Sequence, residues 1–220
     1  MAAQVPDDIG DTSVSTSVRV DDAFQVIVIG DYGVGKTSIL LRFIKDVFYS
    51  DPAEAGYISD FVKEVDVKGK LVKLHIWDTA GLEKHTTITD RYYSKADAAI
   101  MVYDCCDQKS YSNIDKWYGE MHLSLADKLD DNMPVVMVAN KKDKLKEAMK
   151  EATTSYIDFK IAQKKATTLG YTCIETSAKS GENIQKLFNM VAEALSDKEC
   201  PKVPDTVDLL ADDRKKPCSC

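Results

Sequence analysis

The chain has 220 residues, 44% apolar and 30% charged, a composition that suits one globular domain and leaves little room for a second. Its formal net charge of -7 argues against a nucleic-acid-binding body, since affinity for a phosphate backbone depends on Lys and Arg. The six cysteines have neither zinc-site spacing nor a regular disulfide framework, and no apolar run is long enough for a membrane-spanning helix. Three cysteines lie in apolar runs and are expected to be small core residues: Cys105, Cys106 and Cys173.

The two ends of the chain differ in composition from its centre. Residues 1–22 lack the basic start and apolar middle of a signal peptide, and Ala2 stands where N-myristoylation needs a glycine. We therefore expect cytosolic topology. Residues 1–22 and 196–220 are rich in Asp, Ser, Thr, Pro and Lys, so we expect flexible ends around one domain at 23–195.

The first half of the domain predicts a strand, a helix and a β-hairpin in that order. Residues 24–29 form a short β-branched run that ends at a glycine, and apolar residues recur at helical spacing over 39–47. Apolar and polar residues alternate over 61–67 and 71–77, which predicts two antiparallel strands that turn at 68–70.

The second half of the domain predicts three more strands and two helices. Residues 98–103 and 134–139 are continuous apolar runs, typical of parallel strands buried on both faces, and a helical pattern over 114–125 lies between them. A strand over 171–175 and a helix over 184–195 complete the domain.

This order of elements predicts the fold class. Strands that alternate with helices need crossover connections, which are right-handed in a parallel sheet. We therefore expect an α/β fold with a six-stranded, mostly parallel sheet, one antiparallel edge from the hairpin, and helices on both faces. Ligands in such folds bind beyond the carboxyl ends of the strands, and each motif below follows a strand end.

Residues 30–37 read Gly-Asp-Tyr-Gly-Val-Gly-Lys-Thr and fit the pattern GxxxxGK[ST] between a strand and a helix, as in P-loop NTPases. The glycines allow backbone N–H groups to wrap the α- and β-phosphates of a nucleotide. Lys36 is expected to reach the β- and γ-phosphates, and Thr37 to give its hydroxyl oxygen to Mg²⁺. The predicted contacts in and beside this loop are Asp31, Tyr32, Gly33, Val34, Gly35, Lys36, Thr37 and Ser38.

Two further motifs follow strand ends. In Asp78-Thr79-Ala80-Gly81, the carboxylate of Asp78 is expected to reach Mg²⁺, usually through water, and the N–H of Gly81 to meet the γ-phosphate. Residues 140–143 read Asn-Lys-Lys-Asp. The carboxylate of Asp143 can accept two hydrogen bonds from guanine N1–H and N2–H₂, a pair of donors that adenine lacks. This motif therefore predicts GTP and GDP rather than ATP.

The remaining base contacts come from neighbouring residues of these loops. Asn140 is expected to orient its loop and face the base, and the aliphatic part of Lys141 to lie over the base plane. After the sixth strand, the residues expected on the guanine O6 side and base face are Ser177, Ala178 and Lys179.

Five segments agree with one known family: residues 73–81 (Lys-Leu-His-Ile-Trp-Asp-Thr-Ala-Gly), 92–93 (Tyr-Tyr), 102–104 (Val-Tyr-Asp), Asp107 and 175–179 (Glu-Thr-Ser-Ala-Lys). Residues 24–195 resemble a small GTPase of the Ras superfamily, most closely its Rab branch. The resemblance implies a GTP/GDP switch with Mg²⁺ that regulates vesicle traffic on the cytoplasmic face of intracellular membranes and cycles with the cytosol. It also implies a monomer with effectors, an exchange factor, an activating protein and a prenyl-chain chaperone as partners.

By the same resemblance, Phe61, Trp77 and Tyr92 form the aromatic triad that Rab proteins present to effectors. The alternative for each is ordinary interstrand or helix packing.

The chain departs from the family at its catalytic positions. Leu82 stands where the family carries the glutamine that orients the attacking water, and an alkyl side chain cannot make those hydrogen bonds. Loss of a water-positioning group typically costs about 10²-fold in rate, or roughly 3 kcal/mol of barrier, so we expect slow hydrolysis. Tyr32 replaces a small residue near the γ-phosphate, where it could obstruct an activating partner's arginine or hydrogen-bond the phosphate.

The switch threonine of the family also has no clear counterpart. Its position falls near Ala55 or Gly56, which lack a side-chain oxygen, and Ser50 or Ser59 could substitute only if the loop is rearranged. These residues therefore do not predict the family's coupling between the γ-phosphate and switch order.

The tail ends in Cys218-Ser219-Cys220 after a short basic run, which resembles the Cys-x-Cys ending that Rab proteins use for double geranylgeranylation. Two lipid chains give stable anchoring where one does not. An unmodified tail is the alternative.

Taken together, these features predict a Rab-like switch with slow GTP hydrolysis. A GTP-locked effector platform with negligible hydrolysis is the alternative, favoured by Leu82. A P-loop kinase or ATPase of another branch is disfavoured by residues 140–143.

Overall fold

A computed structural model describes residues 20–51, 54, 60–79, 93–124, 133–150 and 156–197, with every side chain in those ranges except 20–23 and 146–147. Several predicted functional residues lie outside these ranges: Ala55, Gly56, Ser59, Ala80, Gly81, Leu82, Tyr92, Cys218 and Cys220.

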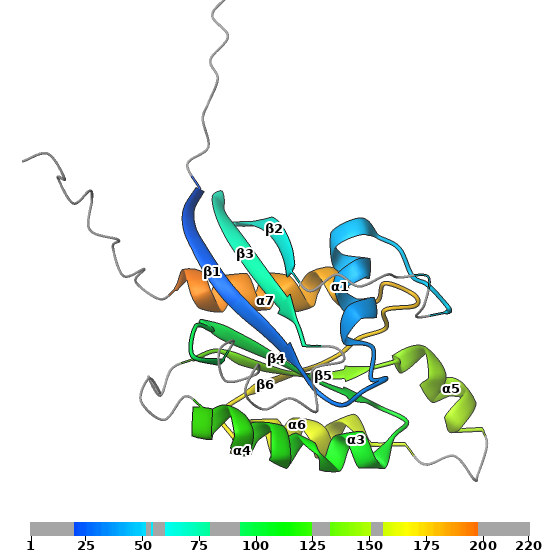
Figure 1. Ribbon diagram of the computed structural model, residues 1–220. Coiled ribbons are helices and arrows are strands. Elements are labelled where there is room, and N and C mark those ends of the chain that lie inside the picture. Colours follow the sequence, from blue (N-terminus) through cyan, green and yellow to red (C-terminus); the bar gives the residue numbers. More distant parts are fainter. Residues whose placement is uncertain are drawn as a thin grey trace, which may run out of the picture.

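Six strands form one sheet in the order β2-β3-β1-β4-β5-β6 (Figure 1). Their bounds are Val20–Ile29 (β1), Asp60–Val67 (β2), Lys70–Asp78 (β3), Ala98–Asp104 (β4), Val135–Asn140 (β5) and Thr172–Glu175 (β6). β2 pairs with β3 in antiparallel fashion, and all other neighbours are parallel. The predicted fold class, with its single antiparallel edge from the hairpin, is thus confirmed.

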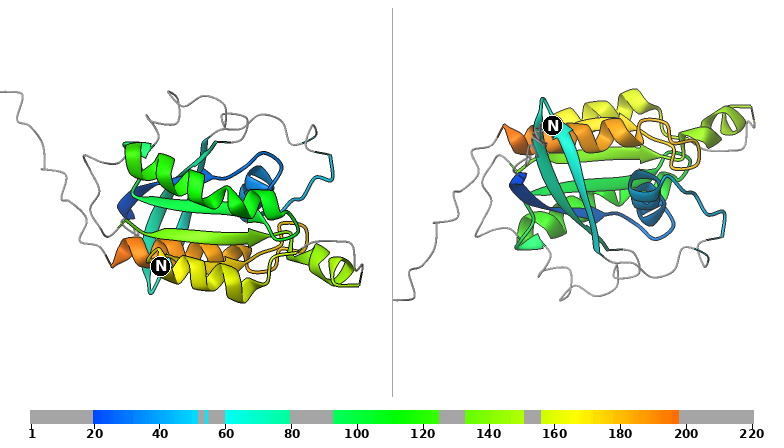
Figure 2. Two further views of the ribbon diagram at one scale, coloured as in Figure 1. Left: turned by 90° about the horizontal axis from the view of Figure 1, so that it is seen from below. Right: turned by 90° about the horizontal axis from the view of Figure 1, so that it is seen from above.

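The helices cover both faces of the sheet (Figures 1 and 2). Their bounds are Lys36–Lys45 (α1), Gln108–Ser112 (α3), Ile114–Ser124 (α4), Leu145–Ala148 (α5), Phe159–Thr168 (α6) and Ile184–Ser196 (α7), and a 3-10 turn, η2, spans Lys142–Lys144. In both figures α5 projects from the body beyond the carboxyl end of β5. None of the helices in the described ranges is both long enough and apolar enough to cross a bilayer.

Two apolar layers form the core, one on each face of the sheet. Side chains of a strand alternate between its faces, so Val26 and Val28 pack under α1 and α7, whereas Ile27 and Ile29 pack under α4 and α6. All four side chains are fully buried. This burial on both faces explains why the central strands are continuous apolar runs in the sequence.

Some details differ from the sequence-based expectations. α6 was not predicted, because its buried face consists of two alanines, Ala162 and Ala166, which give a weak apolar pattern. Cys106 is only partly buried, since it lines the cavity described below, and Cys173 is also partly buried. α1 ends at Lys45 because Asp46 takes a left-handed conformation with φ of 54°.

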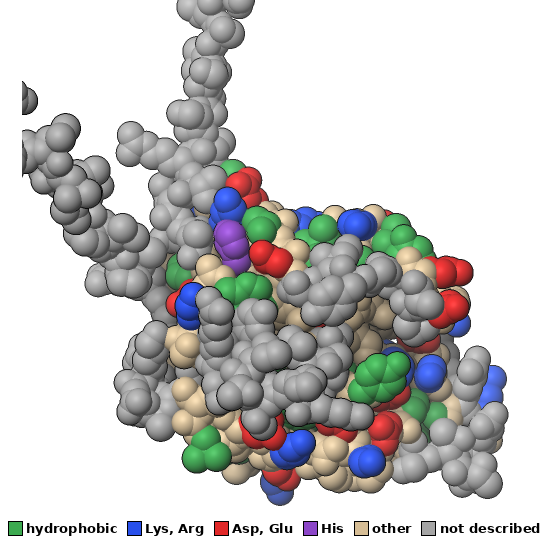
Figure 3. Space-filling view, viewed as in Figure 1, with side chains coloured by type: hydrophobic (Ala, Val, Ile, Leu, Met, Phe, Trp, Pro, Cys, Tyr) green, Lys and Arg blue, Asp and Glu red, His purple; other side chains and the backbone are tan. Residues whose placement is uncertain are grey.

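Acidic and basic side chains of the described residues are interspersed over the face seen in Figure 3.

Candidate functional site

The motifs that follow β1, β5 and β6 meet at the carboxyl end of the sheet around a cavity of about 730 Å³. A volume of a few hundred to about 1,000 Å³ is typical of sites for small molecules and cofactors. Its walls come from the glycine loop after β1, the Asn-Lys-Lys-Asp segment after β5, the loop after β6 and the segment after α1. Ser50, a possible substitute for the switch threonine, is part of this wall, and the wall residues not predicted from the sequence are Phe48, Tyr49, Cys106, Lys144 and Ala148.

Two glycines of the loop after β1 are required by close backbone packing. A Cβ on Gly30, at φ of 141°, would lie 2.1 Å from the backbone oxygen of Val102 in β4. A Cβ on Gly35, at φ of 97°, would lie 2.4 Å from Nδ2 of Asn140. Both distances are far below van der Waals contact, and both φ values disfavour a side chain. The glycine loop can therefore lie against β4 and β5 only with these residues.

Lys36 is 3% exposed and curls back under the glycine loop. Its Nζ donates hydrogen bonds to the backbone oxygens of Gly30, at 2.7 Å, and Asp31, at 2.9 Å. The ammonium is thus fixed beside the loop whose N–H groups are predicted to bind phosphate.

The two predicted metal ligands are neighbours in space although they are 41 positions apart in the sequence. The Thr37 hydroxyl donates to Oδ2 of Asp78 at 2.5 Å. The Thr79 hydroxyl donates to the backbone oxygen of Val28 at 2.7 Å, which holds the end of β3 against β1. A hydroxyl and a carboxylate oxygen side by side are the hard oxygen donors that Mg²⁺ prefers, so the residues present fit this ion.

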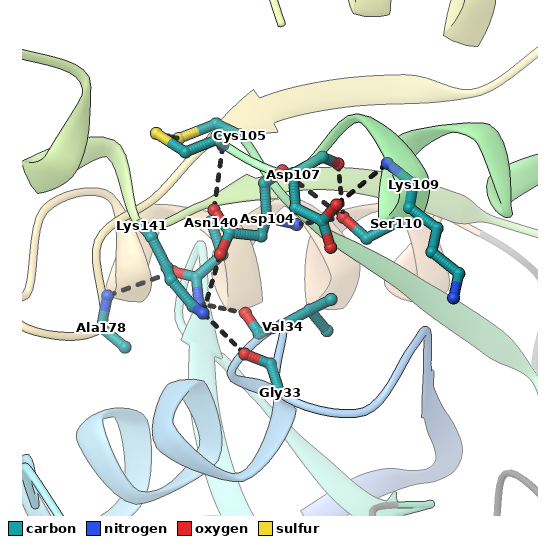
Figure 4. A network of polar contacts seen from close by, with 11 residues as sticks. Gly33, Val34, Asp104, Cys105, Asp107, Lys109, Ser110, Asn140, Lys141 and Ala178 are labelled. Atoms are coloured by element: carbon teal, nitrogen blue, oxygen red, sulfur yellow. Dashed lines mark hydrogen bonds and ion pairs between the residues drawn. The ribbon is translucent and has the colours of Figure 1, made fainter. Parts of the chain in front are cut away.

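Asn140 joins three loops of the site through one side chain (Figure 4). Its Nδ2 donates to the backbone oxygen of Val34 at 2.9 Å. Its Oδ1 accepts from the Thr176 hydroxyl at 3.2 Å and from the Ala178 N–H at 3.3 Å. The side chain is 1% exposed, so these bonds are made away from water. Thr176 was not predicted as a site residue.

Lys141 makes a second link between the glycine loop and β5 (Figure 4). It takes a left-handed conformation, with φ of 66°. Its Nζ donates to the backbone oxygen of Gly33 at 2.6 Å and pairs with Oδ2 of Asp104 at 2.8 Å. Asp104, the last residue of β4, was not predicted as a site residue. The stem of Lys141 thus runs along the wall of the cavity.

The base-recognition candidate, Asp143, lines the same cavity and accepts a hydrogen bond at Oδ1 from the Ser177 hydroxyl at 2.6 Å. Ser177 is fully buried, and its hydroxyl oxygen accepts from the Ser180 N–H at 3.0 Å. The Ser177 hydroxyl therefore orients the carboxylate of Asp143 from the loop after β6. On the adjacent Lys142, a hydrogen bond to the Glu182 carboxylate raises the pKa of the ammonium.

Arg42 of α1 also holds the loop after β6. Its Nε donates to the backbone oxygen of Ala178 at 2.9 Å, and its Nη2 donates to that of Lys179 at 3.0 Å. These bonds leave both residues on the cavity wall. Nothing in the helical pattern of α1 pointed to this contact.

Comparison with known proteins agrees with this geometry. The family model for the Ras family matches residues 25–197. Ras-related protein Rab-1D of Dictyostelium discoideum is 35% identical over 208 residues, an alignment that covers 92% of this chain and 96% of the relative. The chain belongs to the Ras family. It is a Rab-like small GTPase, an enzyme that hydrolyses GTP, of the kind that acts as a switch in membrane traffic.

Two side chains of this GTPase's glycine loop are not part of the cavity wall. The carboxylate of Asp31 accepts hydrogen bonds from Trp117 of α4 and from Asn113, the residue before that helix. Tyr32 is 83% exposed, so its ring stands in solvent on the surface of the loop. Asp31 therefore contributes its backbone, rather than its carboxylate, to the predicted phosphate site.

The two described members of the predicted effector triad lie on opposite faces of the sheet. Phe61 is 4% exposed and packs in the layer under α1 and α7, which agrees with the packing alternative. Trp77 is partly buried against the layer under α4 and α6. The effector role of the triad stays a prediction, and Tyr92 lies outside the described residues.

Proposed function

We propose that this Rab-like GTPase binds GTP and GDP in the 730 Å³ cavity, with Mg²⁺ at Thr37 and Asp78, and hydrolyses GTP slowly because Leu82 cannot position water. The observation that carries the nucleotide assignment is the convergence of three motifs, joined by Asn140, on one cavity. The 35% identity to Ras-related protein Rab-1D supports a role in membrane traffic.

Each part of the nucleotide has its own set of residues in this proposal. Backbone N–H groups of residues 31–38 and the Lys36 ammonium bind the phosphates, and Lys36 stabilises the negative charge that develops as the γ-phosphate leaves. Asp143 reads the two guanine donors, and Lys141 covers the base. Thr37 and Asp78 would hold Mg²⁺, which neutralises phosphate charge when bound.

The cleavage step needs a water in line with the bond to the γ-phosphate. Gly81 is proposed to donate its N–H to the γ-phosphate, but Leu82 can neither donate to nor accept from the water. The water is then oriented only by the phosphate and its neighbours, and the barrier rises by roughly 3 kcal/mol. Hydrolysis therefore proceeds, but slowly.

A GTP-locked platform is the second candidate, and the exposure of Tyr32 favours it. In this candidate the Tyr32 ring, which is 83% exposed on the glycine loop, obstructs a partner that approaches the γ-phosphate. Combined with Leu82, this obstruction would leave the protein in its GTP state for most of its life. Its function would then be to recruit effectors without regular turnover.

One experiment separates the two candidates. The nucleotide in purified protein is released by denaturation and identified by chromatography, and GTP hydrolysis is then followed in a single turnover. The Leu82→Gln variant is the matched comparison, expected to be about 10²-fold faster if water positioning is the missing function. GDP that forms measurably over several days supports the slow switch, and GTP that shows no hydrolysis over that time supports the platform. Equal rates for both proteins would contradict the role assigned to Leu82.

The membrane partner is proposed from the sequence of the tail. Two geranylgeranyl groups on Cys218 and Cys220 would anchor the protein on the cytoplasmic face of an intracellular membrane, and a prenyl-chain chaperone would extract it. Effectors, an exchange factor and an activating protein complete the cycle. Replacement of both cysteines by serine should abolish prenylation by a prenyltransferase, measured by mass, and leave nucleotide binding unchanged.

A further inference from the structure

Asp31 places a negative charge in a loop that is proposed to bind a polyphosphate. Like charges at short range oppose binding, and more strongly where water is excluded. The structure avoids this conflict by turning the side chain out of the cavity. Its Oδ1 accepts from the indole Nε1–H of Trp117 at 2.8 Å, and its Oδ2 accepts from Nδ2 of Asn113 at 2.6 Å.

Both donors sit on one rigid turn of the helical layer. The backbone N–H of Asn113 closes α3 on the carbonyl of Lys109 at 2.9 Å, and the carbonyl of Asn113 accepts from the N–H of Trp117 at 3.0 Å. The Trp117 side chain is 3% exposed within the layer under α4. The two donors are therefore fixed by packing at the positions that the carboxylate needs.

The same aspartate is held at its other end by the phosphate-site lysine. The backbone oxygen of Asp31 accepts from Nζ of Lys36 at 2.9 Å. Asp31 therefore borders the ammonium that is proposed to bind the phosphates. The contacts of its carboxylate with Asn113 and Trp117 thus bear on the charge at the phosphate site.

We infer that Trp117 and Asn113 are positioning residues for nucleotide binding, which hold the Asp31 carboxylate away from the polyphosphate. The inference rests on the proposed guanine-nucleotide function. It requires that loss of either donor speeds release of GDP and GTP. It also requires that the cleavage rate constant of GTP already bound stays the same, because neither donor touches the reacting atoms.

The test is the dissociation rate of fluorescent GDP, in excess Mg²⁺, from the full chain. Trp117→Phe keeps the aromatic ring and removes the N–H, and we expect release about tenfold faster from the loss of one hydrogen bond to a charged group. Met121→Ala is the matched control. Met121 lies one turn further along α4 in the same apolar layer, so this change loosens the packing without touching Asp31.

A second background separates charge from packing. In Asp31→Asn the negative charge is gone, so adding Trp117→Phe should change the dissociation rate of GDP less than twofold. The double variant should therefore release GDP more slowly than Trp117→Phe alone. If Trp117→Phe speeds release equally in both backgrounds, or if Met121→Ala matches it, the donors only support the core and the inference is wrong. If wild type retains guanine nucleotide and Trp117→Phe releases it at the same rate, the inference is wrong and the proposed function stands. Wild-type protein that fails to retain guanine nucleotide at all overturns the proposed function as well.

Discussion

Replacement of Asn140 by alanine removes the side chain that joins the three loops of the nucleotide site. The change leaves the Val34 carbonyl, the Thr176 hydroxyl and the Ala178 N–H without this partner. The bond to Val34 is short, at 2.9 Å, and the other two are long, at 3.2 and 3.3 Å. At about 1 kcal/mol for the short bond and somewhat less for each long one, we expect the free energy of unfolding to fall by about 2–3 kcal/mol.

The same change should weaken nucleotide binding. The loops that Asn140 joins form the walls of the cavity. In the variant these loops are less ordered before the nucleotide binds, so part of the binding free energy is used to order them. A loss of about 1.4 kcal/mol corresponds to a tenfold rise in the Kd for GDP, and we expect at least this rise.

Two assays measure these effects. Urea unfolding of nucleotide-free protein gives the stability, and titration with fluorescent GDP gives the Kd. Asn183→Gly is the control, because Asn183 donates to the Glu175 carbonyl at 2.8 Å outside the cavity, and glycine keeps its φ of 60°. The control should lose stability without losing GDP affinity. An Asn140→Ala protein with wild-type stability and Kd would refute the role assigned to this amide.

Three further predictions concern the metal, the glycine loop and pH. Removal of Mg²⁺ with a chelator should speed GDP release from wild type much more than from Thr37→Ala, and equal acceleration would contradict the metal assignment. Gly30→Ala should lower the unfolding midpoint far more than Gly69→Ala, since a Cβ meets Val102 in the first case and open space in the second; equal shifts would show that the loop can move. Burial raises the pKa of the Cys173 thiol to about 12, so unfolded chain ionises first and the free energy of unfolding should fall as pH rises from about 8.5 towards 12. Urea unfolding at pH 8, 10 and 11 measures this slope, which should be smaller in Cys173→Ala.

The sheet could be predicted from the sequence because its central strands are buried on both faces. That burial leaves continuous apolar runs, such as 98–103 and 134–139, which correspond closely to β4 and β5. The amino end of β1 could not be predicted, since residues 20–23 carry no apolar alternation and belong to the strand through backbone pairing with β3. α6 was missed because its buried face consists of two alanines, which give a weak apolar pattern. Asp158 at its N-cap was nevertheless a usable signal of a helix start.

The candidate site could be predicted only where it follows strand ends in local motifs. Residues 30–37, 78–79 and 140–143 each carry a pattern that a short window contains, and the fold brings them together. Arg42, Trp117 and Thr176 support these loops from elements far away in the sequence, and each also fits an ordinary helical or loop position. Contacts of this kind depend on how the layers pack, which no local pattern records.

The measurement that tests the account most directly is the base preference of wild type and of Asp143→Asn, by competition of GDP, XDP and ADP for the same site. A carboxylate accepts from guanine N1–H and N2–H₂, whereas an amide can accept from N1–H of xanthine and donate to its 2-carbonyl. Wild type should prefer GDP, and Asp143→Asn should prefer XDP. A wild-type preference for ADP, or an unchanged preference in the variant, would contradict guanine recognition at this cavity.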